Sequence, residues 1–274
     1  MEIRKWIPLT WTSWRRKVSV SSGLTPPVLC APRPGPGSNE FNRESMEIYE
    51  PKLTKKDIDH LRKRVLCLLG YRASETHDMN IEEILNNVLD EVDNYATPRG
   101  MFRSLRLLET TDRGIRIEAG HIQSAMLARM GTMCKGDASV VIMVATVGEQ
   151  LQKIRGSCMP LLTQFIVDTV ESELAGMFAD MLEEYCRNCA YHSHLQFSHR
   201  FSPGHCDIDP SQQQVIFNVL DTDRIGVSLN SAMVMSPIKS VSAVAIQARE
   251  VLVKAPCFFC PRDCQWRRIP FQEV

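Results

Sequence analysis

The sequence predicts an α+β fold: a single domain in which helices flank a mixed or antiparallel sheet, with one long helix at the centre. Three observations favour this class. Apolar residues recur at helical spacing in several segments, other segments are short apolar runs rich in β-branched residues, and the two kinds do not alternate in a regular βα repeat. The 274 residues are 44 % hydrophobic and 23 % charged, as is typical of a folded globular protein.

Residues 1–45 differ from the rest of the chain. They hold three of the four tryptophans, six of the fifteen prolines and seven of the 32 Lys and Arg residues, and they end in APRPGPGSNEFNRES. Pro and Gly at this density oppose helices and sheets. We expect a disordered leader, which is either a transit peptide or an untranslated stretch before a true start at Met46. The domain is then expected over residues 46–274.

Helical periodicity predicts five helices in the domain. Thr54 can cap a helix that ends at Gly70, and a second helix runs from Asn80 to Pro98. Further helices are expected over 121–130, over 159–190 and from Pro210, because Pro is well placed in a first turn. The inward face of the long helix is expected to contain Leu161, Phe165, Val170, Leu174, Phe178 and Leu182.

Four strands are also predicted. The segments 114–118, 194–200 and 240–248 are short and apolar or alternating. The run ASVVIMVATVG, residues 138–148, is nearly continuous in β-branched and apolar residues and is bounded by glycines. Such a run predicts a strand that is buried on both of its faces.

Charge and hydropathy exclude some classes of protein. The formal net charge is zero, so no overall field attracts nucleic acid or an anionic membrane. Apolar runs are far shorter than the ~20 residues that a membrane-spanning helix requires. The basic N-terminus has no apolar region typical of a secretion signal. We therefore expect a cytoplasmic protein whose ten cysteines are reduced or bound to metal.

Residues 200–213, RFSPGHCDIDPSQQ, combine a fixed cation with a tight turn. Pro203 and Gly204 set the turn, and Gly lets the backbone approach a ligand closely. The Arg200 guanidinium can pair with a carboxylate through two parallel hydrogen bonds. The pattern suits a small molecule with a carboxylate and other polar edges, although a surface Arg beside an ordinary turn would give the same spacing.

The Cys-rich tail, residues 255–274, contains CFFCPRDCQWRR. Cys257, Cys260 and Cys264 are three thiols on a short loop, which suit zinc or an iron–sulfur cluster with one more ligand. Cys206 is the candidate fourth ligand. Reduced thiols without metal remain an alternative.

A second group of potential ligands lies in EYCRNCAYHSH, where Cys186 and Cys189 precede His192 and His194. Helical Cys more often fills a core, so we interpret this group as structural. The acidic pair of Glu171 and Glu173 is interpreted as part of a solvated helix face.

The motif around Arg200 resembles a known family. It is similar to the S-adenosylmethionine-binding motif Arg-x-x-x-Gly-Tyr of the activation domain of cobalamin-dependent methionine synthase, with Arg200 and Gly204 matching and His205 in place of Tyr. The resemblance continues through IGVSLNSAMVMSPIKSVSAVAI, residues 225–246, where Asn230 and Ser231 replace the family's Thr-Glu. Further matches there are Leu229, Met235, Pro237 and Ser240-Val241-Ser242. It spans about residues 50–268 and is closest to free-standing activation-domain-like proteins.

The resemblance implies a cofactor-binding accessory role in methionine biosynthesis. A protein of this family holds S-adenosylmethionine over an oxidised corrinoid while an electron arrives, and the methyl group restores methylcobalamin. Arg200 would bind the methionyl carboxylate and the Pro203-Gly204 backbone would hold another polar edge, with Ser202 and His205 completing the site. No residue is expected to be catalytic, because the cofactors supply the chemistry.

The partners follow from the same resemblance. The sequence has no corrinoid-binding Asp-x-His-x-x-Gly run, so cobalamin must come in trans on a corrinoid protein or on methionine synthase modules. The electron donor is expected to be flavodoxin- or ferredoxin-like. Two alternatives remain: an independent S-adenosylmethionine methyltransferase, or a metal-binding structural protein of this fold that has lost S-adenosylmethionine binding.

Overall fold

The central feature of the computed structural model, which describes residues 46–71, 78–150, 159–258 and 260, is a five-stranded sheet. The strand order is β1-β2-β6-β10-β7 and every neighbouring pair is antiparallel. The strands are β1 (Glu47–Tyr49), β2 (Arg99–Arg106), β6 (Ser139–Thr146), β10 (Ser240–Ala248) and β7 (Gln196–Phe197). The predicted α+β class with an antiparallel sheet is confirmed, whereas the predicted leader and Cys264 lie outside the described residues.

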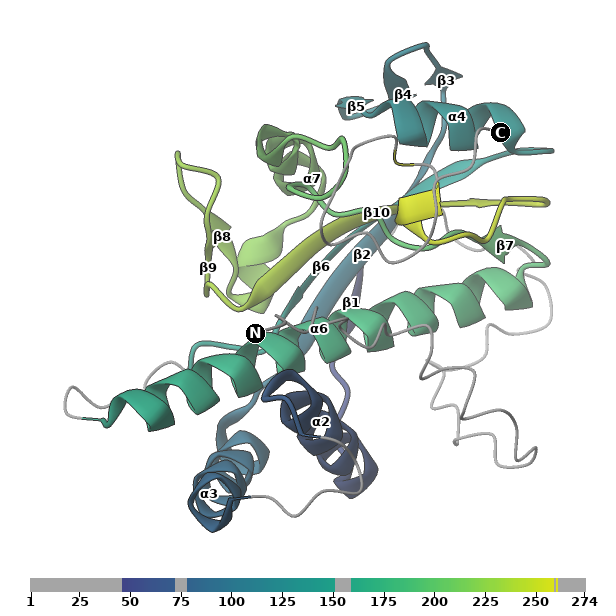
Figure 1. Cartoon of the computed structure of the whole chain (residues 1–274). Coiled ribbons are helices and arrows are strands. Elements are labelled where there is room, and N and C mark those ends of the chain that lie inside the picture. The colour runs from purple at the N-terminus through teal and green to yellow at the C-terminus, as the bar shows by residue number, and fades with distance from the viewer. Residues whose placement is uncertain (1–45, 72–77, 151–158, 259, 261–274) are drawn as a thin grey trace, which may run out of the picture.

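Layers of structure cover both faces of this sheet (Figure 1). One face carries α6, with α2 and α3 beyond it, and the other carries α4, α7 and a small antiparallel sheet β3-β4-β5. The helices are α2 (Lys55–Leu68), α3 (Met79–Tyr95), α4 (Ala125–Met133), α6 (Leu161–His192) and α7 (Gln213–Val219). The remaining strands are β3 (Glu109–Thr110), β4 (Gly114–Ile117), β5 (Gly120–Gln123) and the hairpin of β8 (Ser228–Leu229) with β9 (Met235–Ser236). None of the described helices is long and apolar enough to span a membrane.

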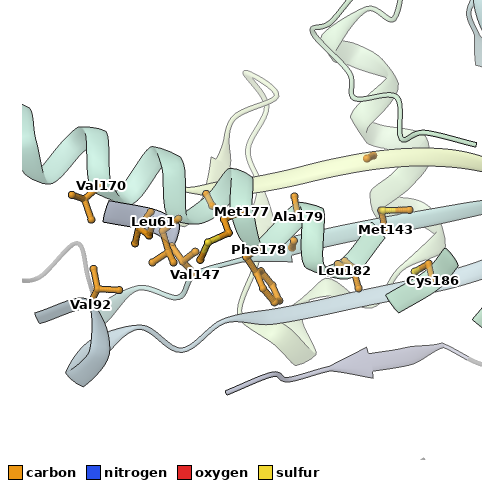
Figure 2. Close-up of a cluster of buried hydrophobic side chains, with 14 of the residues drawn as sticks. Leu61, Val92, Met143, Val147, Val170, Met177, Phe178, Ala179, Leu182 and Cys186 are labelled. Atoms are coloured by element: carbon orange, nitrogen blue, oxygen red, sulfur yellow. The ribbon is translucent and has the colours of Figure 1, made fainter. Parts of the chain in front are cut away.

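Strand β6 separates two hydrophobic cores. All eight of its residues are buried, which confirms the prediction of a strand with two buried faces. Val141, Met143 and Ala145 pack with the α2, α3 and α6 side, while the alternate residues pack toward α4 and α7. This division follows from the two-residue period of a strand. Figure 2 shows Met143 in the first core together with Phe178 and Leu182 of α6.

Helix α6 has 32 residues and lies across one whole face of the sheet (Figure 1). Its predicted inward residues from Val170 onward are buried. The prediction was wrong for Leu161 and Phe165, whose side chains are 83 % and 59 % exposed. The physical reason is rotation about the helix axis: at 3.6 residues per turn, Phe165 lies about 140° from Val170, and the neighbouring Ile166 and Val167 are buried instead.

Three other predictions need correction. The helix predicted over 121–130 begins only at Ala125, because Gly120–Gln123 form β5 and Ser124 is the N-cap. The strand predicted over 194–200 shrinks to Gln196–Phe197, followed by an isolated bridge at Phe201. Strand β2, which pairs with both β1 and β6, was missed.

Candidate functional site

The segment after β7 holds Arg200 at the edge of the sheet. Phe201 exchanges two backbone hydrogen bonds with Val244 of β10, at 2.7 and 2.8 Å, and its side chain is buried. The neighbouring Ser198 is fully buried, and its backbone N–H donates to Ile246 on the same strand. The backbone on each side of Arg200 is therefore fixed to the central sheet.

The turn after Phe201 closes on itself. Gly204 has φ +85°, a left-handed conformation that favours glycine, and its N–H donates to the carbonyl of Ile208 at 2.9 Å. The N–H of His205 donates to the carbonyl of Ser202 at 3.1 Å. We call residues 202–206 the corner. One hydrogen bond within the corner and one to Ile208 hold its shape.

Asp207 fastens the corner to the N-terminus of α4. Its two carboxylate oxygens accept from the Ser124 hydroxyl at 2.8 Å and from the Met126 N–H at 3.0 Å. A carboxylate at this position satisfies an N–H group that the helix leaves unpaired, and it also interacts favourably with the helix dipole. Sequence reasoning missed this role of Asp207, because the partners lie more than 80 residues away.

Arg200 reaches across the sheet edge to α6. Its Nη1 donates to Asp180 Oδ1 and to Glu183 Oε2, both at 2.7 Å. Within the described part of the chain, its Nε and Nη2 have no hydrogen-bond partner. The guanidinium is thus held by carboxylates of the protein on one nitrogen, while the edge formed by the other two nitrogens remains available.

These contacts belong to a larger ion-pair network along one face of α6. Glu183 also accepts from Arg187 at 2.6 Å and from His199 at 3.2 Å, and Asp180 also accepts from Arg64 of α2 at 3.0 Å. The network consists of Arg64, Glu173, Asp180, Glu183, Arg187, His199 and Arg200. It joins α2, α6 and the segment that precedes the corner.

The network controls the charge of Glu183. Burial by itself would raise the pKa of this carboxyl, but the hydrogen bond with His199 and the charge of Arg200 outweigh burial and lower the pKa to about 2. Burial would likewise lower the pKa of Arg200, and the charges of Asp180 and Glu183 reverse that effect and raise it. Both groups are therefore ionised at neutral pH.

The outer surface of the corner is open. Gly204 and His205 are exposed, and Ser202 and Pro203 are partly buried. No described atom lies within 4 Å of the position that a Cβ on Gly204 would take. The carbonyl groups of Pro203 and Gly204 accept no hydrogen bond from the described residues, so they can accept one from a ligand.

The described part of the Cys-rich tail lies beside the corner. Burial and the hydrogen-bonded thiol of Cys260 raise the pKa of Cys206 to about 12, with smaller contributions from Cys257 and Asp207. Cys260 is only 5 % exposed and belongs to the core on the α4 and α7 side. Cys206 is hydrogen-bonded to Cys260, Cys257 lies near enough to influence its charge, and Cys264 lies outside the described residues.

The other two groups singled out in the sequence, around Cys186 and around Glu171, are part of the core or of the ion-pair network. Cys186 is a buried member of the core under α6, as expected for a helical Cys. Glu171 was expected on a solvated face but is 1 % exposed, and Glu173 forms an ion pair with Arg64 at 2.6 Å. Among the residues that the structure describes, no group of three or more His, Cys, Asp and Glu side chains is arranged to hold a metal ion.

The two best-defined surface hollows in the described structure lie away from the corner. One, of about 410 Å³, lies at the C-terminal end of α6, with Tyr191, His194 and Arg249 among its lining residues. The other, of about 220 Å³, lies between β2 and α4. Both are shallow and open, and neither is lined by a residue of the corner.

Comparisons with known proteins place the fold. No protein-family model and no curated protein matched the sequence. Among solved structures, the chain is similar to the MetH reactivation domain bound to AdoHcy, with a TM-score of 0.57 and 14 % sequence identity. The match covers 78 % of this chain and 82 % of that domain. At this identity the likeness concerns the fold, which is that of a methionine synthase reactivation domain.

Proposed function

We propose that the chain binds S-adenosylmethionine at the corner and presents its methyl group to an oxidised corrinoid carried by a partner protein. The observation that carries the proposal is the position of the Arg200-x-x-x-Gly204 motif: an exposed, preformed turn on a fold shared with a domain solved with AdoHcy. AdoHcy is the compound that remains when S-adenosylmethionine has given up its methyl group.

Arg200 supplies the charge that such a ligand requires. The methionyl carboxylate pairs with the edge formed by Nε and Nη2, because two parallel hydrogen bonds match the guanidinium fork. Asp180 and Glu183 hold Nη1 and so fix the plane of the guanidinium before the ligand arrives. A fixed plane lowers the conformational cost of binding.

The corner supplies the remaining contacts. The carbonyl groups of Pro203 and Gly204 accept from the amino group or the adenine edge of the ligand, and the missing side chain of Gly204 leaves room for close approach. His205 is exposed and provides an aromatic ring with a polar end. Ser202 adds a hydroxyl at the rim.

This chain would contribute position rather than chemistry. The corrinoid supplies the cobalt that accepts the methyl group, and a reductant supplies the electron, so both enter as partners. The open surface at the corner suits that arrangement, because a methyl group presented to another protein must face outward. A flavodoxin- or ferredoxin-like protein is the kind of donor that we propose.

One observation favours a different function. Arg200 already has two carboxylate partners, as expected if the fold kept the motif for stability and lost the ligand. The alternative is therefore a structural or accessory protein without S-adenosylmethionine binding. An independent methyltransferase is a third possibility, and no feature of the described structure favours it.

Calorimetric titration of the full chain with S-adenosylmethionine separates the first two functions. We expect binding, and we expect Arg200→Ala to weaken it by about 2–4 kcal/mol, which is roughly 30-fold to 800-fold. Arg64→Ala is the matched control. Arg64 pairs with the same Asp180 and is equally buried, with 19 % of its side chain exposed against 22 % for Arg200, but it belongs to α2.

Three results would contradict the proposal. Absence of binding to the parent chain would support the structural alternative. Equal losses in Arg200→Ala and Arg64→Ala would mean that binding depends on the network and not on the guanidinium. Methyl transfer to an acceptor without a Co(II) corrinoid and a reductant would support the independent methyltransferase.

A further inference from the structure

We propose that the hollow at the C-terminal end of α6 binds a small organic phosphate, with a nucleoside monophosphate as the class of ligand. The inference does not depend on S-adenosylmethionine binding at the corner. The hollow measures about 410 Å³, which is within the usual size range of small-molecule sites. Its lining residues are Tyr191, His192, His194, Leu195, Gln196 and Arg249.

The lining of this hollow carries positive charge and no negative charge. Arg249 is a permanent cation, two histidines lie beside it, and none of the lining residues is Asp or Glu. The smaller hollow differs, because Glu109 and Asp137 line it together with Arg106. An anion therefore suits the larger hollow and not the smaller one.

Arg249 has a charge that the described part of the chain does not compensate. No described residue forms an ion pair or a side-chain hydrogen bond with it. The neighbouring carboxylate of Glu250 already pairs with Lys135 at 2.7 Å. The guanidinium can thus offer two parallel N–H groups to the oxygens of a phosphate.

Backbone pairing fixes the position of Arg249. It follows Ala248, the last residue of β10, which is paired in register with Gln196 of β7. On its other side, Glu250 forms an isolated bridge with Lys135. Because both neighbours are paired with other segments, Arg249 is held at the rim of the hollow, as a preformed site requires.

His194 reaches the hollow from an unusual backbone conformation. Its φ is +57°, in the left-handed region that favours glycine, and it closely follows the end of α6. A histidine at this position therefore costs stability that a glycine would not cost. What the histidine provides is a ring N–H donor at the hollow.

The end of α6 does not repel an anion as strongly as an uncapped helix would. Unpaired carbonyl groups give a helix C-terminus its partial negative charge. In α6 the carbonyl of Ala190 accepts from the N–H of Leu195 at 2.9 Å. The carbonyl of Tyr191 accepts from the N–H of His194, also at 2.9 Å. These carbonyl groups are therefore already paired.

The hydrogen-bond donors suit a phosphate better than a carboxylate. Gln196 Oε1 accepts from the Val251 N–H at 3.1 Å, which leaves the amide nitrogen as a donor. Arg249 and His194 are the other donors in the hollow. Three donor side chains match the three terminal oxygens of a phosphate monoester, whereas a carboxylate has only two oxygens.

The rest of the lining suits a planar group attached to the phosphate. The Tyr191 side chain is 75 % exposed, and its ring meets that of His192 edge to face, with centroids 6.1 Å apart. Leu195 packs against the core under α6 and adds apolar surface. A nucleoside base can stack on the exposed tyrosine ring. A nucleoside monophosphate therefore fits better than inorganic phosphate.

Calorimetric titration of the full chain with uridine monophosphate, uridine and inorganic phosphate tests the proposal. We expect the monophosphate to bind about tenfold more tightly than either of the others, because only it contacts both parts of the hollow. Uridine is chosen because it lacks the adenine that S-adenosylmethionine would bring to the corner.

Substitutions locate the site. Arg249→Ala should weaken binding of uridine monophosphate by about tenfold. Arg129→Ala is the matched control, since Arg129 is exposed on α4 and forms no ion pair with a described residue. Arg200→Ala should also leave this binding unchanged, which separates the proposal from S-adenosylmethionine binding at the corner.

His194→Gly distinguishes binding from folding. Glycine adopts the positive φ without strain, so the melting temperature should stay the same or rise while the affinity for uridine monophosphate falls. The proposal is overturned if the parent chain does not bind uridine monophosphate, if uridine binds equally well, or if Arg129→Ala weakens binding as much as Arg249→Ala. Unchanged affinity in His194→Gly would overturn it as well.

Discussion

Glu183 is the residue whose charge most directly links the network to stability. Its pKa is about 2 in the folded protein and 4.5 in an unperturbed chain, so the folded state prefers the ionised form. A lowered pKa gives stability that is present above pH 4.5 and lost as the pH falls toward 2. Protonation of Glu183 should therefore contribute to acid unfolding.

We expect the free energy of unfolding to fall by roughly 3 kcal/mol across that interval from Glu183 alone. Urea unfolding at a series of pH values measures it. The variant Glu183→Gln should be less stable at neutral pH and should show a smaller slope in the acid range. An unchanged slope in that variant would mean that other carboxyls dominate the acid response.

A second residue-scale prediction concerns Arg200→Lys. An ammonium can still pair with Asp180 and Glu183 but cannot offer a fork to a ligand carboxylate. We expect near-normal stability in thermal melts together with S-adenosylmethionine affinity weakened by about tenfold, less than in Arg200→Ala. Equal affinity for the Lys variant and the parent chain would rule out a bidentate contact.

At this scale, the sequence predicted only those features of the site that depend on neighbouring residues in the chain. The turn at Pro203 and Gly204 could be predicted, because positive φ and a fixed ring are properties of single residues. The carboxylates that hold Arg200 could not, since Asp180 and Glu183 lie 20 and 17 residues away on a helix whose rotation only the packing sets. The anchoring of Asp207 on α4 was hidden for the same reason.

At the scale of elements, the apolar strand β6 was predicted from the sequence, but the strand β2, which contains charged residues, was not. Strand β6 is continuous in apolar residues and was predicted, whereas β2 has the sequence RGMFRSLR and was missed. Its three arginines interrupt the alternation that marks a strand, yet it pairs on both sides. The start of α4 was misplaced because one of its N-terminal hydrogen-bond acceptors, Asp207, comes from another part of the chain.

The contact between β2 and α6 gives an element-scale prediction. A Cβ on Gly100 would lie 3.0 and 3.1 Å from the two Cδ atoms of Leu182, which is fully buried. We expect Gly100→Ala to destabilise the protein by about 1–3 kcal/mol, because the fully buried Leu182 side chain must shift within a close-packed core. Denaturant unfolding measures the change.

Gly176→Ala is its control within α6. There the nearest atom to a new Cβ is Arg64 Nη2 at 3.4 Å, an ordinary contact. Replacing glycine by alanine inside a helix should then stabilise the protein by about 0.5–1 kcal/mol. If both substitutions shift stability in the same direction, close packing at Gly100 is not what determines the result.

At the scale of the whole molecule, the domain has two cores that share one sheet. The core under α6 and the core under α4 and α7 use alternate residues of β6 and β10. If the sheet unfolds, the apolar side chains of both cores become exposed to solvent. We therefore expect a single cooperative unfolding transition. The fold class was predictable because both cores need only apolar periodicity, which the sequence carries.

The composition of residues 1–45 leads to a prediction for the whole chain. They show no apolar face at helix or strand spacing that could join a core. Deleting them should leave the melting temperature and the calorimetric enthalpy unchanged. A drop of several degrees on deletion would contradict the prediction and would mean that the segment is docked on the domain.

Strand β6 has a consequence for how protons exchange with solvent. It is paired on one side with β2 and on the other with β10, and all of its residues are buried. Its amide protons can exchange only when the sheet opens, whereas the exposed first turn of α6 can exchange by local fraying. In deuterated solvent the slowest-exchanging amides should therefore lie in β6. The free energy of opening calculated from their exchange rates under native conditions should equal the free energy of global unfolding.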